Sequence, residues 1–253
     1  SESNADIRRP PASMVKMMQM LLVAEGLHEG AWTLDKQINV SRHAEHMGGT
    51  QVYLAAGETW TLGQLMEAVS VASANDAAMA IAEGLWGSEE AYKLRANERA
   101  AELGMTNTVF NSVHGLPPSP GEEPDHTTAR DMALLGRICV QDPLILKWTS
   151  QRELQFRPNE SIKHSTNKLL WQMDGCDGIK TGYIRDAGFC ITASACRDDV
   201  RLIAVVMGDK RKQERFSSAK RLLEEGFAQV CRKELVAAGQ AVGDPVAVAN
   251  CET

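Results

Sequence analysis

The chain has 253 residues, of which 43% are apolar and 24% are charged, and its formal net charge is −6. This composition indicates a globular protein with a sizeable core, and the acidic balance together with only 5% aromatic residues argues against a nucleic-acid-binding surface. No apolar run reaches the roughly 18 residues that a membrane helix needs. The polar N-terminal residues contain no signal-peptide core, so we expect a secreted protein to be present here in processed or truncated form.

The first half of the chain is predicted to be mainly helical. Residues 13–27 read as an apolar helix that begins at Ser13 and is followed by Gly30. The mixed stretch that follows contains two short strand-like segments, 38–41 and 51–55. Further helices are expected at residues 61–69, 74–85, 89–103 and 128–139, the first capped by Thr61 and the second opened by Ser73.

Near residue 177 the pattern changes to short segments rich in β-branched or apolar residues. Turn-prone residues separate segments 178–183, 188–195 and 201–208, which predicts three successive antiparallel strands. An amphipathic helix follows at 212–230, and the tail 235–253 again has a β-like texture. Helices before and after an antiparallel sheet predict an α/β (α+β) fold of two or three layers.

The cysteines and histidines predict no metal site and no cofactor. None of the six cysteines forms a CxxC pair, and the six histidines form no HExxH motif. Cys190 and Cys196 are expected to share one strand, in which six residues span roughly 20 Å, too far for a disulfide. The pairing of the other four cannot be assigned from the sequence, and we favour buried free thiols.

Ser13 and Lys16 are the first candidate catalytic pair. Residues three apart on a helix share one face, and a buried lysine near a second cation has a lowered pKa and can accept the serine proton. A helix N-terminus also favours the negative charge of a tetrahedral intermediate. The same S-x-x-K spacing recurs at 165–168 in a polar loop and at 217–220 on a polar helix face, so alone it also fits a simple helix cap.

Ser73 and Asn75 form a second candidate pair between two predicted helices. The serine can relay a proton to a leaving amine, and the asparagine can bind a substrate amide. Asp76, three residues after Ser73, also fits an ordinary capping box. The S-x-N pattern recurs once, at 165–167.

Lys180, Thr181 and Gly182 form the third candidate group, a K-T-G sequence that occurs once. A glycine within a strand implies a close approach by another backbone, for which an extended substrate pairing with the strand is one candidate. Lys180 and Thr181 would supply a cation and a hydroxyl for a carboxylate. The alternative is a β-hairpin with a solvated lysine.

The order of the three motifs gives each of them significance. Ser73 follows Ser13 by 60 positions and Lys180 follows Ser73 by 107, and the ordered set SxxK, SxN and KTG is the signature of active-site serine enzymes that act on penicillin and D-Ala-D-Ala peptides. The surrounding text from residue 4 to about 230, including SANDAAMAIAE and DGIKTGYIRDAGFCITASA, resembles the low-molecular-mass penicillin-binding proteins, the serine-type D-Ala-D-Ala carboxypeptidases of peptidase family S11.

This resemblance implies a fold and a set of residue roles. The fold would be the penicillin-binding and serine β-lactamase-like transpeptidase fold, an antiparallel sheet flanked by helices. Ser13 would be the acyl-ester nucleophile, Lys16 its proton acceptor, and Ser73 a third catalytic residue. The implied substrate-binding residues are Asn75, Lys180, Thr181, Gly182 and Tyr183, and the N–H groups of Ser13 and Tyr183 would form the oxyanion hole.

The resemblance also implies a reaction and a location. The enzyme would remove the terminal D-Ala from peptidoglycan stem peptides ending in D-Ala-D-Ala, would be inhibited by β-lactam antibiotics, and would need no metal, cofactor or nucleic acid. It would work in the bacterial cell envelope, periplasmic or extracytoplasmic. Residues 1–233 would form the catalytic domain and 234–253 the start of a truncated C-terminal β domain, with membrane association only through segments absent here.

Two departures from the family pattern bear on the site. Relatives have about two strands before the segment that begins at Asn4, so we expect one sheet edge to be uncovered. Relatives often carry an arginine, in an Asn-Arg-Asn stretch, that helps to bind the terminal carboxylate. Here the stretch is Ser165-Thr166-Asn167.

Three other functions stay open. A D,D-endopeptidase of the same fold often has a Ser-Glu-Asn text in place of the second motif. A serine β-lactamase needs a deacylating glutamate, usually in a Glu-x-x-Leu-Asn loop that is absent here, although Glu122 and Glu123 lie in the same general region, within a Pro-Gly-rich context. The third is an inactive, truncated penicillin-binding module.

Overall fold

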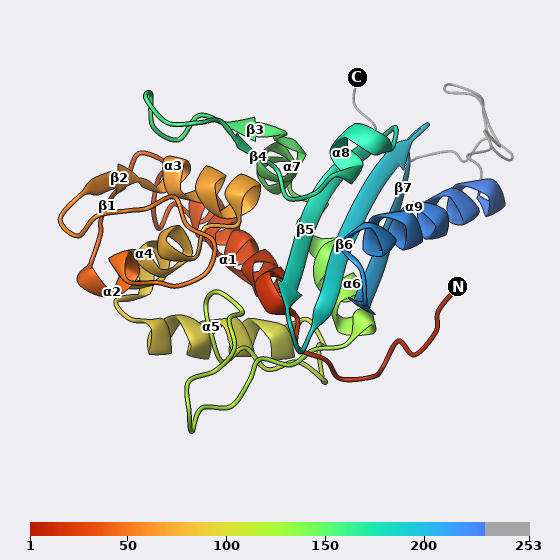
Figure 1. The fold of residues 1–253 in the computed structure, drawn as a ribbon, viewed down its shortest axis with the longest axis horizontal. Helices are drawn as coiled ribbons and strands as arrows, with labels where there is room; N and C mark the ends of the chain where they lie inside the picture. The colour runs from red at the N-terminus through yellow and green to blue at the C-terminus, as the bar shows by residue number, and fades with distance from the viewer. Residues whose placement is uncertain (231–253) are drawn as a thin grey trace, which may run out of the picture.

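The computed structural model describes residues 1–230 and places a group of helices beside a three-stranded antiparallel sheet (Figure 1). The helical part consists of a 3-10 turn η1 (Ala12–Val15), α1 (Lys16–His28), α2 (Arg42–Glu45), α3 (Leu62–Glu67), a π turn η2 (Ala68–Ala72), α4 (Asn75–Trp86) and α5 (Glu89–Glu102). The helices nearer the sheet are α6 (Ala129–Cys139), α7 (Pro143–Ser150), α8 (Leu169–Gln172) and α9 (Lys212–Gln229).

The main sheet has the strand order β5-β6-β7, formed by Cys176–Ile184, Gly188–Arg197 and Val200–Asp209. Two small hairpin ladders complete the strands: β1 (Gln37–Asn39) with β2 (Thr59–Thr61), and β3 (Glu153–Leu154) with β4 (Lys163–His164). No strand within residues 1–230 pairs with the outer edge of β7.

Alternation along β7 explains why helices cover both faces of the sheet. Leu202 and Val206 pack into a core on one face, together with Phe216 of α9. Ile203 and Val205 pack into the larger core on the opposite face, which contains α1, α4 and α6. Successive strand residues point to opposite faces, so an apolar residue at nearly every position requires a layer on each side. The observed architecture is therefore the mixed, layered fold predicted from the sequence.

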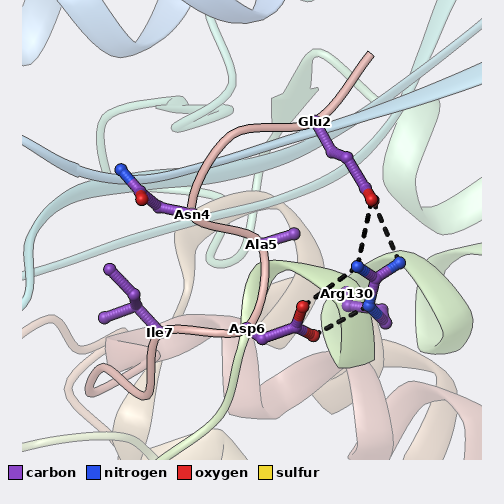
Figure 2. A pocket seen from close by; sticks show the side chains of 6 residues that line it. All are labelled: Glu2, Asn4, Ala5, Asp6, Ile7 and Arg130. Carbon is purple, nitrogen blue, oxygen red and sulfur yellow. Dashed lines mark hydrogen bonds and ion pairs between the residues drawn. The ribbon is translucent and has the colours of Figure 1, made fainter.

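The N-terminal segment is attached to the start of α6 through Arg130. The Arg130 guanidinium forms ion pairs with the carboxylates of Glu2 and Asp6, and its backbone N–H donates to the carbonyl of Ala5 (Figure 2). A backbone bridge between Arg9 and Thr127 continues this attachment. These contacts bring the segment preceding Ser13 to the side of the sheet.

The three main strands, the capped helix at Thr61 and the final helix agree with the sequence prediction. The strand expected at 51–55 is wrong, because the Asp76 carboxylate accepts hydrogen bonds from the N–H groups of Val52 and Leu54 where a neighbouring strand would otherwise do so. Helices α2, α7 and α8 were not predicted. The proposed C-terminal β segment at 234–253 lies outside the described residues.

In the part of the chain that the structure describes, no helix combines the length and apolar character needed to cross a bilayer.

Candidate active site

The three sequence motifs meet between the helical part and the sheet. The Lys16 Nζ lies 3.1 Å from the Ser13 Oγ and 2.7 Å from the Asn75 Oδ1. The Lys180 Nζ donates to the Ser73 Oγ at 2.8 Å. The motifs therefore form two adjoining Ser–Lys pairs, and the members of the second pair are 107 positions apart in the chain.

Ser13 belongs to a strained turn that precedes α1. It is half-buried within η1, after Ala12, whose φ of 49° lies in the left-handed region that non-glycine residues seldom adopt. The helix expected to begin at Ser13 instead begins as a 3-10 turn, and the α-helical part starts at Lys16. Gly115 packs against this turn so closely that an added Cβ would lie 2.1 Å from the Ala12 carbonyl oxygen.

Ser73 does not open a helix, and this corrects the sequence prediction. Its backbone is left-handed (φ 62°, ψ 31°), and it lies between the π turn η2 and α4, which begins at Asn75. Asp76 forms no capping box with it and instead binds the segment at Val52 and Leu54. The ordinary helix-cap interpretation of Ser73 therefore fails, while strain at this position is typical of functional sites.

Burial and charge prepare Lys16 to lose its proton. Lys16 is fully buried, and burial first and the charge of Lys180 second lower the pKa of Lys16 well below its usual range, as predicted. The carboxylates of Asp125 and Asp76 oppose this shift. Burial, followed by the charge of Arg215, lowers the pKa of Lys180 to about 7.

The K-T-G segment lies on β5 beside Ser13. An added Cβ on Gly182 would lie 2.6 Å from the Pro11 carbonyl oxygen and 3.2 Å from the Ser13 nitrogen. The close backbone approach predicted at this glycine is therefore made by the turn that carries Ser13. The Thr181 hydroxyl donates to the Thr166 Oγ1 at 2.7 Å, and Tyr183 is 54% exposed and stacks on Phe189.

Three residues of the site were not singled out from the sequence. The His114 carbonyl oxygen accepts from the Lys16 Nζ at 2.9 Å, and a backbone acceptor leaves no side-chain signature in a sequence. Arg215 is buried and donates to the carbonyl oxygen of Gly182 at 3.0 Å. Arg215 lies four residues before the buried Ala219 on α9, and this spacing could have indicated that Arg215 is on the buried face of the helix. Asp125 is the third such residue, and only its buried contacts identify it.

Of the two repeated motif patterns, the one at 165–168 lies beside β5 and the one at 217–220 lies on α9. Ser165 was placed in a polar loop but is buried, and its hydroxyl accepts from the Asn167 N–H beside β5. Ser217 is exposed on α9, where its hydroxyl donates to the Gln213 carbonyl. The exposed Glu122, a candidate for a β-lactamase carboxylate, accepts from the Ser119 N–H within its own turn.

The four described cysteines are free, as favoured from the sequence, and Cys190 and Cys196 share β6. Cys139 and Cys190 are buried, whereas Cys176 and Cys196 are only partly so, which corrects the expectation of uniform burial. The remaining two lie outside the described residues. Across residues 1–230, no group of three or more His, Cys, Asp or Glu side chains is arranged to hold a metal ion.

Comparison with known proteins gives a consistent family. The family model described as D-alanyl-D-alanine carboxypeptidase matches residues 1–211. The D-alanyl-D-alanine carboxypeptidase DacF of Bacillus subtilis is 38% identical over 229 residues, covering 89% of this chain and 58% of its own length. This chain therefore spans less than two thirds of that relative.

Solved structures show the same fold. The D-alanyl-D-alanine carboxypeptidase DacD of Francisella tularensis superposes with a TM-score of 0.84 at 29% identity, covering 90% of this chain and 67% of that one. Penicillin-binding protein D2 of Listeria monocytogenes, solved in an ampicillin-bound form, superposes with a TM-score of 0.80 at 30% identity, covering 90% and 91%.

Proposed function

This chain belongs to the D-alanyl-D-alanine carboxypeptidase family, and we propose that it removes the terminal D-Ala from peptidoglycan stem peptides through an acyl-enzyme on Ser13. The observation that carries the proposal is the Lys16–Ser13 contact of 3.1 Å. A buried lysine with a lowered pKa lies within hydrogen-bond reach of a half-buried serine hydroxyl.

Acylation begins with proton transfer from the Ser13 Oγ to a neutral Lys16 Nζ. The Ser13 oxygen then attacks the carbonyl carbon of the penultimate D-Ala, and the N–H groups of Ser13 and Tyr183 stabilise the negative charge of the tetrahedral intermediate. The C–N bond to the terminal D-Ala breaks as the leaving amine takes a proton. Ser73, which accepts a hydrogen bond from Lys180, is positioned to relay that proton. A water molecule then hydrolyses the Ser13 ester.

Substrate recognition is assigned to the residues around these two pairs. Asn75 binds a substrate amide, and its own amide nitrogen is already held by the Gly48 carbonyl at 2.7 Å. Lys180 and Thr181 receive the terminal carboxylate along β5. Position 166, where relatives often carry an arginine, is a threonine bonded to Thr181, so carboxylate binding relies on fewer cations here.

We further propose that β-lactam antibiotics acylate Ser13 and that the protein works in the bacterial cell envelope, outside the cytoplasmic membrane. The first proposal is supported by the likeness to a penicillin-binding protein solved with ampicillin. The second follows from the location of stem peptides in the cell wall.

The test is covalent labelling followed by turnover. Incubation with benzylpenicillin should add one acyl group to the intact mass, mapped to Ser13, and Ser13→Ala should abolish it. D-Ala should be released from a stem pentapeptide by the wild type only. An unlabelled wild-type protein would sink the proposal and favour an inactive module.

Two further substrates separate the related activities. Cleavage of a cross-linked peptide dimer at a rate above D-Ala release would favour the endopeptidase alternative. Rapid multiple turnover of a chromogenic cephalosporin would favour the β-lactamase alternative.

A further inference from the structure

The His114 carbonyl oxygen is a fixed acceptor between the nucleophile and the base. It lies 2.9 Å from the Lys16 Nζ and 3.4 Å from the Ser13 Oγ. A carbonyl oxygen in this position orients the Lys16 ammonium group. It also competes with the Ser13 hydroxyl oxygen for the ammonium protons. The loop that carries it, residues 111–116, must therefore be held to within a few tenths of an ångström for the pair to work.

Asp125 holds this loop through three hydrogen bonds. One carboxylate oxygen accepts from the N–H groups of Asn111 at 2.6 Å and Ser112 at 2.9 Å, and the other accepts from the Ser112 hydroxyl at 2.6 Å. The Ser112 oxygen in turn accepts from the Gly115 N–H at 2.8 Å. A continuous chain of hydrogen bonds thus runs from Asp125 to the residue that follows His114.

The same carboxylate acts on Lys16 through its charge. Asp125 is only 5% exposed, and all of its hydrogen-bond donors are neutral. Burial raises the pKa of the Asp125 carboxyl, and the hydrogen bonds from Ser112 and Asn111 and the charge of Lys16 oppose this shift. The charge of Asp125 is the first of two that favour the protonated form of Lys16. The other titratable groups that face this pair are Asp76 of α4, Lys180 of β5, His114 of the loop itself, and Glu89 and Tyr92 of α5.

We propose that Asp125 is a positioning residue for acyl transfer, which fixes the His114 carbonyl against Lys16 through Ser112. This inference rests on the proposed function, because it assigns a role relative to the acylation of Ser13. Asp125 does not contact the reacting atoms.

The sign of the charge effect follows directly. A nearby carboxylate stabilises the ammonium form of Lys16 and raises the pKa of Lys16, so removing the charge lowers that pKa further. Lys16 then loses its proton at a lower pH, and the acid limb of the acylation rate must move to lower pH. A residue that only supports the fold would lower the rate at every pH without moving the limb.

The experiment measures the second-order rate constant for acylation by a fluorescent penicillin across a pH series. In Asp125→Asn the amide oxygen can still accept from the two N–H groups, but the charge is gone. For each protein, the acylation rate constant at acid pH is divided by its value on the high-pH plateau. This ratio should be about threefold larger for Asp125→Asn than for the wild type. Ser112→Ala keeps the charge and cuts the hydrogen-bond chain, so its plateau should fall about tenfold with the limb unmoved.

Asp131→Asn is the matched control. Asp131 is also a buried carboxylate that accepts from a backbone N–H, at Asn107, and from a hydroxyl, at Thr108. Asp131 is not among the charges that act on Lys16. The acid limb of the acylation pH profile of Asp131→Asn should therefore match that of the wild type.

The outcomes distinguish the proposed function from the two roles of Asp125. A wild-type protein that takes up no penicillin contradicts the proposed function itself. A labelled wild type with an unmoved limb in Asp125→Asn overturns the charge role, and an undiminished plateau in Ser112→Ala overturns the positioning role. Should Asp125→Asn fail to fold, the Ser112→Ala result decides the inference.

Discussion

Replacing Lys180 by methionine should make the protein more stable in mild acid, although it destroys the site. Lys180 is 1% exposed, and burial together with the charge of Arg215 lowers the pKa of Lys180 from 10.5 to about 7. The folded state therefore binds fewer protons than the unfolded state between these two pH values. Stability must fall as the pH decreases through this range, and the full penalty is present below about pH 7.

The size of this penalty can be worked out from the shift. At about 1.4 kcal/mol for each pH unit, it amounts to roughly 5 kcal/mol below neutral pH. Methionine has a similar length and no charge to bury. It gives up the hydrogen bonds from the Lys180 Nζ to the Ser73 hydroxyl and the Thr181 carbonyl, each of which contributes about 1.5 kcal/mol when the donor is charged. The net expectation is a gain of about 2 kcal/mol near pH 6.

Urea denaturation of wild type and Lys180→Met at two pH values tests this reasoning. The gain should be seen near pH 6 and should turn into a loss of about 2 kcal/mol near pH 10, where the lysine is neutral in the folded state and only its hydrogen bonds remain to be lost. The same variant should acylate far more slowly, as expected when a site is built at the expense of stability. A stability difference that is equal at both pH values would refute the argument.

The remaining predictions concern packing around the nucleophile. Gly115→Ala should slow acylation at least about a hundredfold, because its Cβ would lie 2.1 Å from the Ala12 oxygen. Gly121→Ala, at a similarly positive φ with nothing within 4 Å, should cost only about 1–2 kcal/mol of stability and leave labelling unchanged, and equal labelling rates for the two variants would contradict this. Gln19→Leu removes a hydrogen bond to the Ala78 carbonyl but also an unpaired buried oxygen, so its unfolding free energy should change by less than about 1 kcal/mol. A larger loss would indicate that the unpaired oxygen has a partner.

Regular elements and motif chemistry were predictable because both depend on local patterns. The apolar run in β7 and the helix cap at Thr61 each involve only residues that are close together in the chain. The lowered pKa of Lys16 was also predictable, since an apolar helix and a second lysine motif were both visible in the sequence.

The backbone of the site was not predictable, because distant contacts determine it. Ser73 is left-handed in spite of its good helix-cap chemistry, and residues 51–55 form no strand in spite of their β propensity. In the second case a single carboxylate, Asp76, replaces the neighbouring strand. Likewise, His114 contributes through its backbone carbonyl, which leaves no trace in residue type. Asp125 contributes through its carboxylate, but its partners Asn111 and Ser112 lie 14 and 13 residues away in the chain.

The division of the site between two parts of the molecule has a mechanical consequence. Ser13 and Lys16 are joined by a single turn of chain, so their contact persists through any relative movement of helices and sheet. The contact between Ser73 and Lys180 instead bridges the end of η2 and β5, two elements that are far apart in the chain. A small separation of the two parts would therefore uncouple protonation of the leaving group while the nucleophile stays paired with its base. In the proposed mechanism, this bridging contact is the joint at which mechanical stress or a bound ligand would first interrupt proton transfer to the leaving group.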